Sequence, residues 1–301
     1  MTATLAPGAD RRRPEDVPPL PPRLQLVRAV LVLVLVASVS ILLQLMFVSR
    51  LQHDSAQRRA FDAYRSKLAN GTAPIGPTDD LNVELPLGAG VAYLEIPAID
   101  LAEVVLEGTT SPVLFDGPGH RRDTPLPGQV GTSVLMGRRA AYGGSFGDLG
   151  DLRKGDEITV TTGQGVFTYV VTGARRDGDV LPPALPRNGS RLTLVTAAGS
   201  PFMPDGVYSV DAELDGQATG GPARLYTADS LPLDERVMSG DAGTLWALAL
   251  WLQGLILLSV GAAWSWNRWS RAASWIVFFP PLLLVGLAAA GEVARLLPNL
   301  L

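Results

Sequence analysis

Three long apolar runs dominate the pattern of hydrophobic and polar positions along the chain. They cover residues 29–49, 242–267 and 272–291, and each run lies between charged residues. About 20 apolar residues are enough for a helix to cross the hydrocarbon core of a membrane. A buried core helix is the alternative for each run, but uncharged runs of this length argue against it. The pattern therefore predicts transmembrane helices at 28–49, 242–267 and 272–295.

Details within two of the runs refine this prediction. Pro280 and Pro281 lie in the middle of the third run and predict a kink there. The first run could also be the apolar core of a signal peptide, but such cores are shorter, roughly 7–15 residues, and precede a small-residue cleavage site. Arg50 and His53 follow the run here, so an uncleaved membrane anchor is favoured.

Residues beside the runs indicate how the chain crosses the membrane. Basic residues are typical of cytoplasmic flanks, and they occur before the first run and in the turn between the second and third: Arg11, Arg12, Arg13, Arg23, Arg28, Arg268 and Arg271. Four tryptophans that suit a membrane interface flank that turn: Trp264, Trp266, Trp269 and Trp275. The chain is thus predicted to be a multi-pass plasma-membrane protein in contact with the lipid bilayer. Its N-terminus is expected in the cytoplasm, and the segment between the first two helices outside.

The segment predicted to lie outside is acidic. From Arg50 to Asp241 it has 25 Asp and Glu residues against 17 Lys and Arg, which argues against nucleic acid as a partner. Residues 1–27, rich in proline and charge, predict a disordered cytoplasmic tail. Residues 50–89 predict a juxtamembrane helix, continuing from the anchor over 50–69, and then a polar linker. Residues 216–241 predict a second linker.

Between residues 90 and 215 the pattern changes to short β-like runs separated by turns. Seven runs predict strands: 91–96, 103–107, 132–136, 157–161, 166–171, 191–196 and 207–214. Residues 162–165 join two of them as a hairpin would. Thirty-two glycines and 24 prolines are too many for an all-helical bundle. Because closure removes exposed sheet edges, we predict an all-β closed barrel as the extracytoplasmic domain.

The inventory of reactive side chains is short. The chain has no cysteine and only two histidines, His53 and His120. Disulfides, thiolate metal sites and cysteine nucleophiles are therefore excluded. Two histidines are also too few for a metal site built from histidine ligands. The acidic residues of 148–157 lack the spacing of a calcium loop. We accordingly expect no metal and no cofactor.

Motifs within the predicted barrel resemble those of the sortase family, in order and spacing. They are Ile96-Pro97, Gly108-Thr109, Gly117-Pro118-Gly119-His120, residues 124–131, residues 146–158 and Thr193-Leu194-Val195-Thr196. The ordered match covers about residues 90–215 and is similar to classes E and D. The resemblance implies a barrel of about eight strands on the outer face of a Gram-positive membrane. The abundance of Ala, Gly, Arg and Pro would suit an actinobacterial source.

The resemblance also implies three catalytic positions. Sortases are transpeptidases that use a cysteine nucleophile, a histidine proton donor and an arginine that stabilises the oxyanion. The family's histidine position is occupied here by Arg138, its cysteine position by Ala197, and its arginine falls near Val207. The resemblance therefore implies a barrel whose catalytic triad is entirely replaced.

The sequence thus predicts a membrane-anchored pseudoenzyme with a sortase-like fold. It would bind a sorting-signal-like peptide, a surface protein, a cell-wall component or an active sortase, which it would regulate. Candidate groove-binding residues are His120, Arg138, Arg139, Thr196 and Ser200. Two adjacent guanidinium groups could hold a carboxylate or a phosphate.

Two alternatives stay open at this point. The chain could be an active hydrolase or transpeptidase of the same fold with a relocated serine or threonine site, in which Ser200 or Thr196 pairs with His120. The two arginines, in turn, could simply be a surface pair that balances Asp148 and Asp151.

Overall fold

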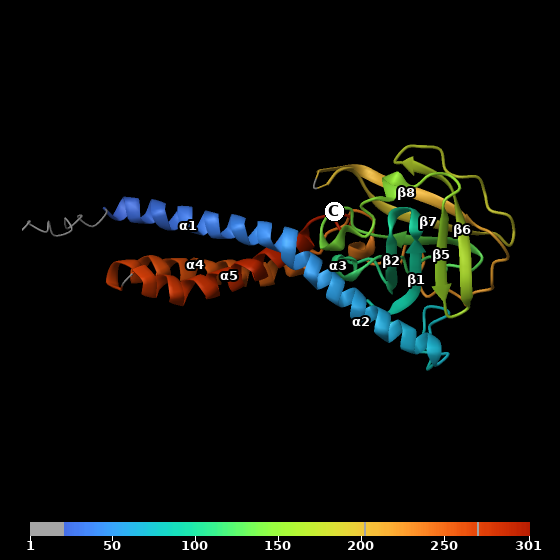
Figure 1. Ribbon diagram of the computed structural model, residues 1–301, viewed down its shortest axis with the longest axis horizontal. Helices are drawn as coiled ribbons and strands as arrows, with labels where there is room; N and C mark the ends of the chain where they lie inside the picture. The colour runs from blue at the N-terminus through green and yellow to red at the C-terminus, as the bar shows by residue number, and fades with distance from the viewer. Residues whose placement is uncertain (1–20, 202, 270) are drawn as a thin grey trace, which may run out of the picture.

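The computed structural model describes residues 21–201, 203–269 and 271–301. A barrel lies at one end of the molecule and three helices extend from it side by side (Figure 1). The tail predicted at 1–27 falls largely outside the described residues. Helix α1 (Pro22–Leu43) begins within that range.

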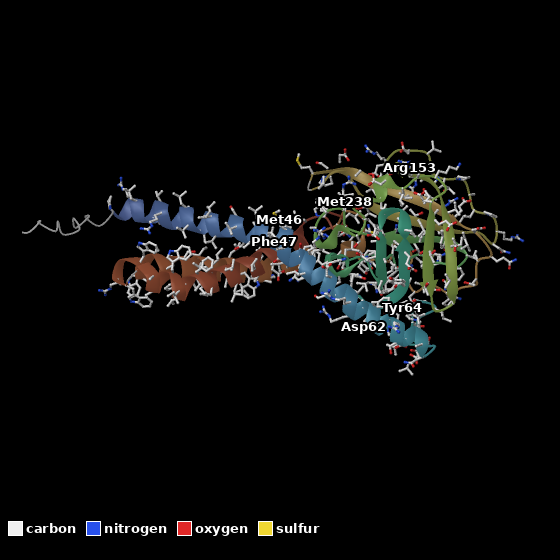
Figure 2. The ribbon with its side chains drawn as sticks, viewed as in Figure 1. Met46, Phe47, Asp62, Tyr64, Arg153 and Met238 are labelled. Carbon is white, nitrogen blue, oxygen red and sulfur yellow. The ribbon has the colours of Figure 1, made fainter. Side chains whose placement is uncertain are left out.

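The first apolar helix continues without a break into the barrel domain. Helix α1 passes through one π-helical turn, η1 (Gln44–Val48), into α2 (Ser49–Ala69). Met46 and Phe47 of this turn are exposed where the helix leaves its two neighbours (Figure 2). The amphipathic helix predicted at 50–69 is therefore a direct extension of the apolar helix.

The other two apolar runs also form helices. A short 3-10 turn, η6 (Ala242–Thr244), leads into α4 (Leu245–Arg268), and α5 (Arg271–Leu296) continues through both prolines. All three predicted spans are confirmed as helices long and apolar enough to cross a membrane. They pack closely where Gly286 of α5 touches Ser40 of α1, because a Cβ at Gly286 would collide with the serine side chain.

Eight strands form the closed barrel that the sequence predicts. They are β1 (Gly90–Ile96), β2 (Leu101–Glu107), β3 (Gly119–His120), β4 (Gly131–Met136), β5 (Glu157–Thr162), β6 (Gly165–Arg176), β7 (Ser190–Ser200) and β8 (Met203–Leu214). Their order around the barrel is β1-β2-β3-β4-β7-β8-β6-β5. The pairs β2–β3 and β4–β7 are parallel, and the remaining neighbours are antiparallel.

Short helices connect the strands. They are η2 (Pro97–Ile99), α3 (Ser111–Asp116), η3 (Tyr142–Gly144), η4 (Leu149–Asp151) and, after the barrel, η5 (Leu233–Glu235). Strand β3 and helix α3 have no counterpart in the sequence prediction, because two and six residues are too few to show a period.

Alternating apolar residues fill the barrel interior. Leu94, Ile158, Leu194 and Val210 come from four different strands and are fully buried in one cluster. Tyr169 is buried among them, and its hydroxyl accepts a hydrogen bond from Gly128 N at 2.6 Å. The alternation of apolar and polar residues along the strands thus corresponds to an inner face and an outer face of the barrel.

Helix α2 covers the outer side of β1 and β2. The Tyr64 hydroxyl donates to the carbonyl oxygens of Val91 and Thr161, at 3.0 and 3.2 Å. The Gln57 side chain accepts a hydrogen bond from Val104 N at 2.8 Å. It thereby provides a partner for a backbone N–H of β2 that the short β3 does not reach. Figure 2 shows Tyr64 on the part of α2 that lies against the barrel.

We predict that Tyr64→Ala will detach this part of α2. Truncating a buried aromatic side chain costs about 3 kcal/mol or more, which corresponds to roughly 100-fold in a local opening equilibrium. Hydrogen exchange of residues 57–69 should accelerate by about that factor. Asp62→Ala, at an exposed position on the same helix, should leave the exchange unchanged. Equal acceleration by both variants would contradict the role given to Tyr64.

Candidate functional site

The barrel register brings three segments together at one end of β4 and β7. Met136, the last residue of β4, is the partner of Val195 of β7, so the residues that follow β4 lie beside Thr196 and Ala197 of β7. Ala197 is the partner of Val207 on β8. The Arg139 guanidinium donates from Nη1 to the carbonyl oxygen of Ala197 at 3.3 Å. The segments that carry the three predicted family positions therefore meet at one place.

Arg138 is enclosed at this place by aromatic rings. Only 1 % of the residue is exposed. The rings of Phe115 and Tyr142 stack with their centroids 3.7 Å apart, and the guanidinium carbon lies 4.8 and 5.5 Å from the two centroids. Burial lowers the pKa of Arg138 to about 10, so the side chain still carries its charge near neutral pH.

No carboxylate neutralises this buried charge among the residues that the structure describes. Arg138 donates from Nη1 to the carbonyl oxygen of Asn299 at 3.4 Å, and its Nε has no partner. Neither Arg138 nor Arg139 forms an ion pair with Asp148 or Asp151 within the described ranges. The interpretation of Arg138 as a member of a balanced surface pair was wrong, because the residue lies beneath the surface.

An unusual backbone conformation at Tyr142 positions the ring of this residue beside Arg138. Tyr142 has φ 53°, in the left-handed region that side chains other than glycine rarely adopt. The next residue, Gly143, has φ 79°, and a Cβ there would collide with the imidazole of His53 on α2. Gln44, in the π turn of the first helix, donates to the Tyr142 hydroxyl at 3.2 Å. The first apolar helix, through its π turn, thus contacts the residue whose ring covers Arg138.

The segment that follows α5 fills the site. Asn299 and Leu300 are fully buried. Leu300 packs against Leu114, Met136 and Val195 and against Ala197. Figure 1 shows this end of the chain running from the helices into the barrel beside α3. The groove at Ala197 is therefore closed in this structure. The sequence alone does not predict whether it is open or closed.

The remaining predicted site residues do not form a relocated catalytic group. Thr196 is fully buried, and its Oγ1 has no partner among the described residues. Ser200 is exposed at the far end of β7. His120 lies on β3 with its ring nitrogens 2.9 Å from Glu107 Oε2 and 3.1 Å from the Pro125 carbonyl oxygen. Both nitrogens are occupied, and neither contacts Thr196 or Ser200.

Comparison with known families identifies the barrel. The family model of the sortase domain matches residues 94–204. A curated relative, sortase D of Bacillus subtilis (strain 168), is 36 % identical over 84 residues, which are 28 % of this chain and 41 % of the relative. This chain belongs to the sortase family. The chain aligns with less than half the length of that relative.

Solved sortase structures are also similar to this sortase chain. The sortase D5 transpeptidase of Clostridium perfringens is 26 % identical, with 54 % of this chain and 99 % of that chain covered and a TM-score of 0.45. Sortase E of Streptomyces avermitilis is 32 % identical, with 50 % of this chain and all of that chain covered and a TM-score of 0.38.

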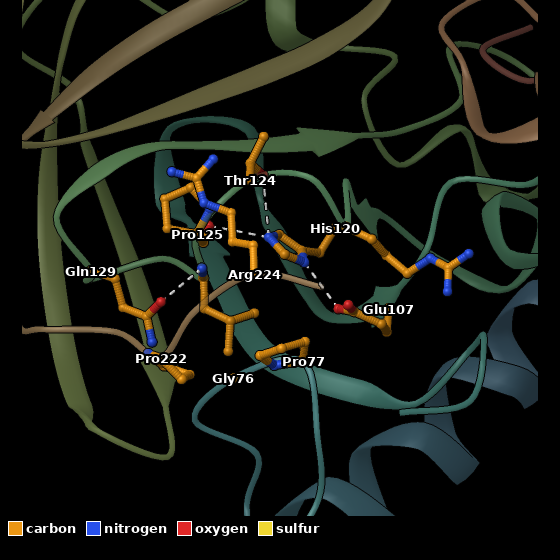
Figure 3. Close-up of a pocket in the computed structure, with 11 residues that line it drawn as sticks. Gly76, Pro77, Glu107, His120, Thr124, Pro125, Gln129, Pro222 and Arg224 are labelled. Atoms are coloured by element: carbon orange, nitrogen blue, oxygen red, sulfur yellow. Dashed lines mark hydrogen bonds and ion pairs between the residues drawn. The ribbon is translucent and has the colours of Figure 1, made fainter. Parts of the chain in front are cut away.

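His120 forms a buried ion pair inside the sortase domain. Together with Glu107 and Thr124 it lines a cavity of about 20 Å³ (Figure 3), which is room for one water. Burial lowers the pKa of His120, but the Glu107 carboxylate and the Pro125 carbonyl oxygen outweigh burial, so the pKa is raised above 6.5. A carbonyl oxygen can only accept a hydrogen bond, so His120 Nε2 donates to the Pro125 carbonyl oxygen. This nitrogen therefore cannot act as a base toward Thr124, whose hydroxyl oxygen lies 3.3 Å away.

Sequence reasoning missed the residues that enclose the site. Phe115 and Tyr142 are single aromatic residues in irregular segments, where no periodicity marks them. Asn299 and Leu300 follow a predicted membrane helix and carry no signal for the barrel. Among the described residues no group of three or more His, Asp or Glu side chains comes together as a metal site would require.

The His120–Glu107 pair predicts a pH dependence of stability. Because the folded protein binds the His120 proton more tightly than the unfolded chain, the contribution of the pair is complete below about pH 6.5 and is lost as the pH rises through the raised folded-state pKa. The stability advantage of the wild type over His120→Gln should therefore shrink as the pH rises from 6 to 9. Urea unfolding of the detergent-solubilised protein measures this difference. An advantage that grows with pH would contradict the assignment.

Proposed function

We propose that this sortase-family protein is a non-catalytic binding module held at the outer face of the plasma membrane. One observation carries the proposal: Ala197 occupies the position at which the family's cysteine is expected, and the chain has no cysteine anywhere. A transpeptidase of this family needs a thiolate to form its acyl intermediate. An alanine methyl group supplies no nucleophile.

The surroundings of Ala197 support the same interpretation. Arg138, at the family's histidine position, remains protonated near neutral pH even with its pKa lowered to about 10, so it does not exchange a proton with a leaving amine. Val207, near the family's arginine position, has no side-chain donor for an oxyanion. The Arg139 guanidinium contacts Ala197, and it donates to the main-chain carbonyl oxygen of that residue.

The relocated serine or threonine site is the second candidate function. Among the described residues, the buried and unpartnered hydroxyl of Thr196 is the observation that favours it. A hydroxyl nucleophile needs an adjacent base within about 3 Å. His120 donates or pairs through both of its nitrogens elsewhere, and His53 pairs with Glu103 on the outer side of the barrel. The binding module is therefore the better supported function.

The membrane context completes the proposal. Three apolar helices and the basic residues near their predicted inner ends support a multi-pass arrangement with a cytoplasmic N-terminus and an extracytoplasmic barrel. Arg28 lies with its guanidinium carbon 4.6 Å from the Trp266 ring centroid, which places two predicted interface residues together. The partner would be a sorting-signal-like peptide, a surface protein or an active sortase. A class E or D origin in a Gram-positive actinobacterium belongs to the same proposal.

To test this proposal, the full-length protein is mixed with a panel of sorting-signal peptides, and the products are identified by mass spectrometry. The proposal predicts intact peptides and a protein of unchanged mass. A cleaved peptide or an acyl-protein adduct would overturn it and would direct the search to a new nucleophile.

Restoring the cysteine alone should not restore the reaction. Ala197→Cys supplies a thiol, but no proton donor and no oxyanion-stabilising arginine stand at the other two positions. We therefore predict no transpeptidation or cleavage by this variant in the same assay, against an active family member as the positive control. Measurable turnover would show that Arg138 and Val207 are not the positions of the two missing residues.

A further inference from the structure

The segment 297–301 lies in the groove through hydrogen bonds to several parts of the fold. The Asn299 side-chain amide donates to the carbonyl oxygens of Thr109 and Arg236, at 2.9 and 3.0 Å. Its backbone N–H donates to Ser239 O at 2.8 Å. The Leu300 carbonyl oxygen accepts from Arg139 N at 2.9 Å. These contacts join the segment both to the barrel and to the linker that precedes α4.

An apolar pocket holds the Leu300 side chain. Leu114 of α3, Met136 of β4 and Val195 of β7 surround it, and Ala197 contributes its methyl group. Val207 and Met238 pack at the edge of the same cluster, and Figure 2 shows Met238 at the end of the barrel that faces the helices. A leucine that is fully buried in this way contributes about 2 kcal/mol from the apolar surface removed from water.

The segment also covers the Arg138 guanidinium. Within the described residues, the Asn299 carbonyl oxygen is its one hydrogen-bond acceptor. A buried guanidinium needs acceptors, and the backbone carbonyl oxygen of an extended peptide is one that any sequence can supply. The groove thus contains a main-chain contact at Arg138 and Arg139, an amide contact at Thr109 and Arg236, and an apolar pocket.

We propose that this groove is a binding site for an extended peptide with an asparagine followed by a leucine, and that residues 298–301 occupy it as an internal ligand. An external peptide of this class must displace them. The inference rests on the proposed non-catalytic function, and it names the chemistry of the ligand and the way access to the groove is controlled.

The contacts explain why asparagine and leucine are selected. The Asn299 amide is a double donor to two carbonyl oxygens, whereas an aspartate would place acceptor oxygens against acceptors. An aspartate in place of Leu300 would set a carboxylate against the apolar side chains of Leu114, Met136 and Val195 and would lose the burial of the leucine side chain. Both substitutions should therefore release the segment.

Attachment to α5 makes the internal ligand difficult to displace. Leu297 directly follows the helix, and the end of α5 is held by Arg295, whose Nη2 lies 2.7 Å from Asp241 Oδ2. A tethered ligand has an effective concentration in the millimolar range. An external peptide with the same contacts must exceed that concentration to compete with the intact segment, and it should bind much better once the segment has been released.

Because the natural chain has no cysteine, a single introduced thiol can report on whether the groove is open. In Ala197→Cys the new thiol is the only one in the chain, and it lies beneath Leu300. We would measure the rate of its alkylation by iodoacetamide in full-length, detergent-solubilised protein. Adding Leu300→Asp should increase the rate at least tenfold. A capped synthetic peptide with the sequence of residues 296–301 should slow it again, and the same peptide with aspartate in place of asparagine should not.

A second cysteine position controls for general unfolding. Ala212→Cys places a thiol on β8 in the barrel core, where the residue is also fully buried, and Leu300→Asp should not change its slow alkylation. If this control accelerates as well, the milder Asn299→Ala replaces Leu300→Asp and must expose the thiol at position 197 alone.

Three outcomes separate the inference from the proposed function. An unchanged rate at position 197 in a variant that keeps the control silent overturns the internal ligand. Acceleration without protection by the peptide overturns the ligand class. Cleavage of the peptide by the protein with natural Ala197, seen by mass spectrometry, overturns the non-catalytic function and leaves the internal ligand in place.

Discussion

The parallel pairing of β4 with β7 is the constraint on which the site depends. It places the residues after β4 beside those near the end of β7, and the antiparallel partner β8 adds Val207 to the same place. Parallel neighbours cannot be joined by a tight hairpin, and here about 50 residues of chain, including the β5–β6 hairpin, separate the two strands. A closed barrel fixes this register, because a shift of one residue would turn every core side chain outward.

Two segments connect this barrel to the apolar helices, and both contact the site. The first helix enters through Gln44 and His53, which contact Tyr142 and Phe115 beside Arg138. The last helix enters through Asn299 and Leu300. Because both connections contact residues of the groove, a movement of α1 or α5 would change the groove.

The amino-acid sequence predicts the parts of this structure that repeat a period. The three apolar helices and seven of the strands follow from runs long enough to show it, and the family motifs lead to the closed barrel. Strand β3 has only two residues and helix α3 only six, so neither shows a pattern. The closure of the groove depends on contacts between Asn299 and Thr109 or Arg236, which are far apart along the chain. No local signal encodes them, and the same is true of the aromatic pair that encloses Arg138.

We propose that the sortase fold is used here for binding without a nucleophile. Intact-mass spectrometry of the full-length protein after treatment with phenylmethylsulfonyl fluoride tests this proposal, because the reagent sulfonylates the oxygen of an activated hydroxyl and releases fluoride. We expect an unmodified protein, since neither Thr196 nor Ser200 lies beside a base. A single stoichiometric adduct that maps to either residue would instead establish a relocated active site and overturn the non-catalytic function.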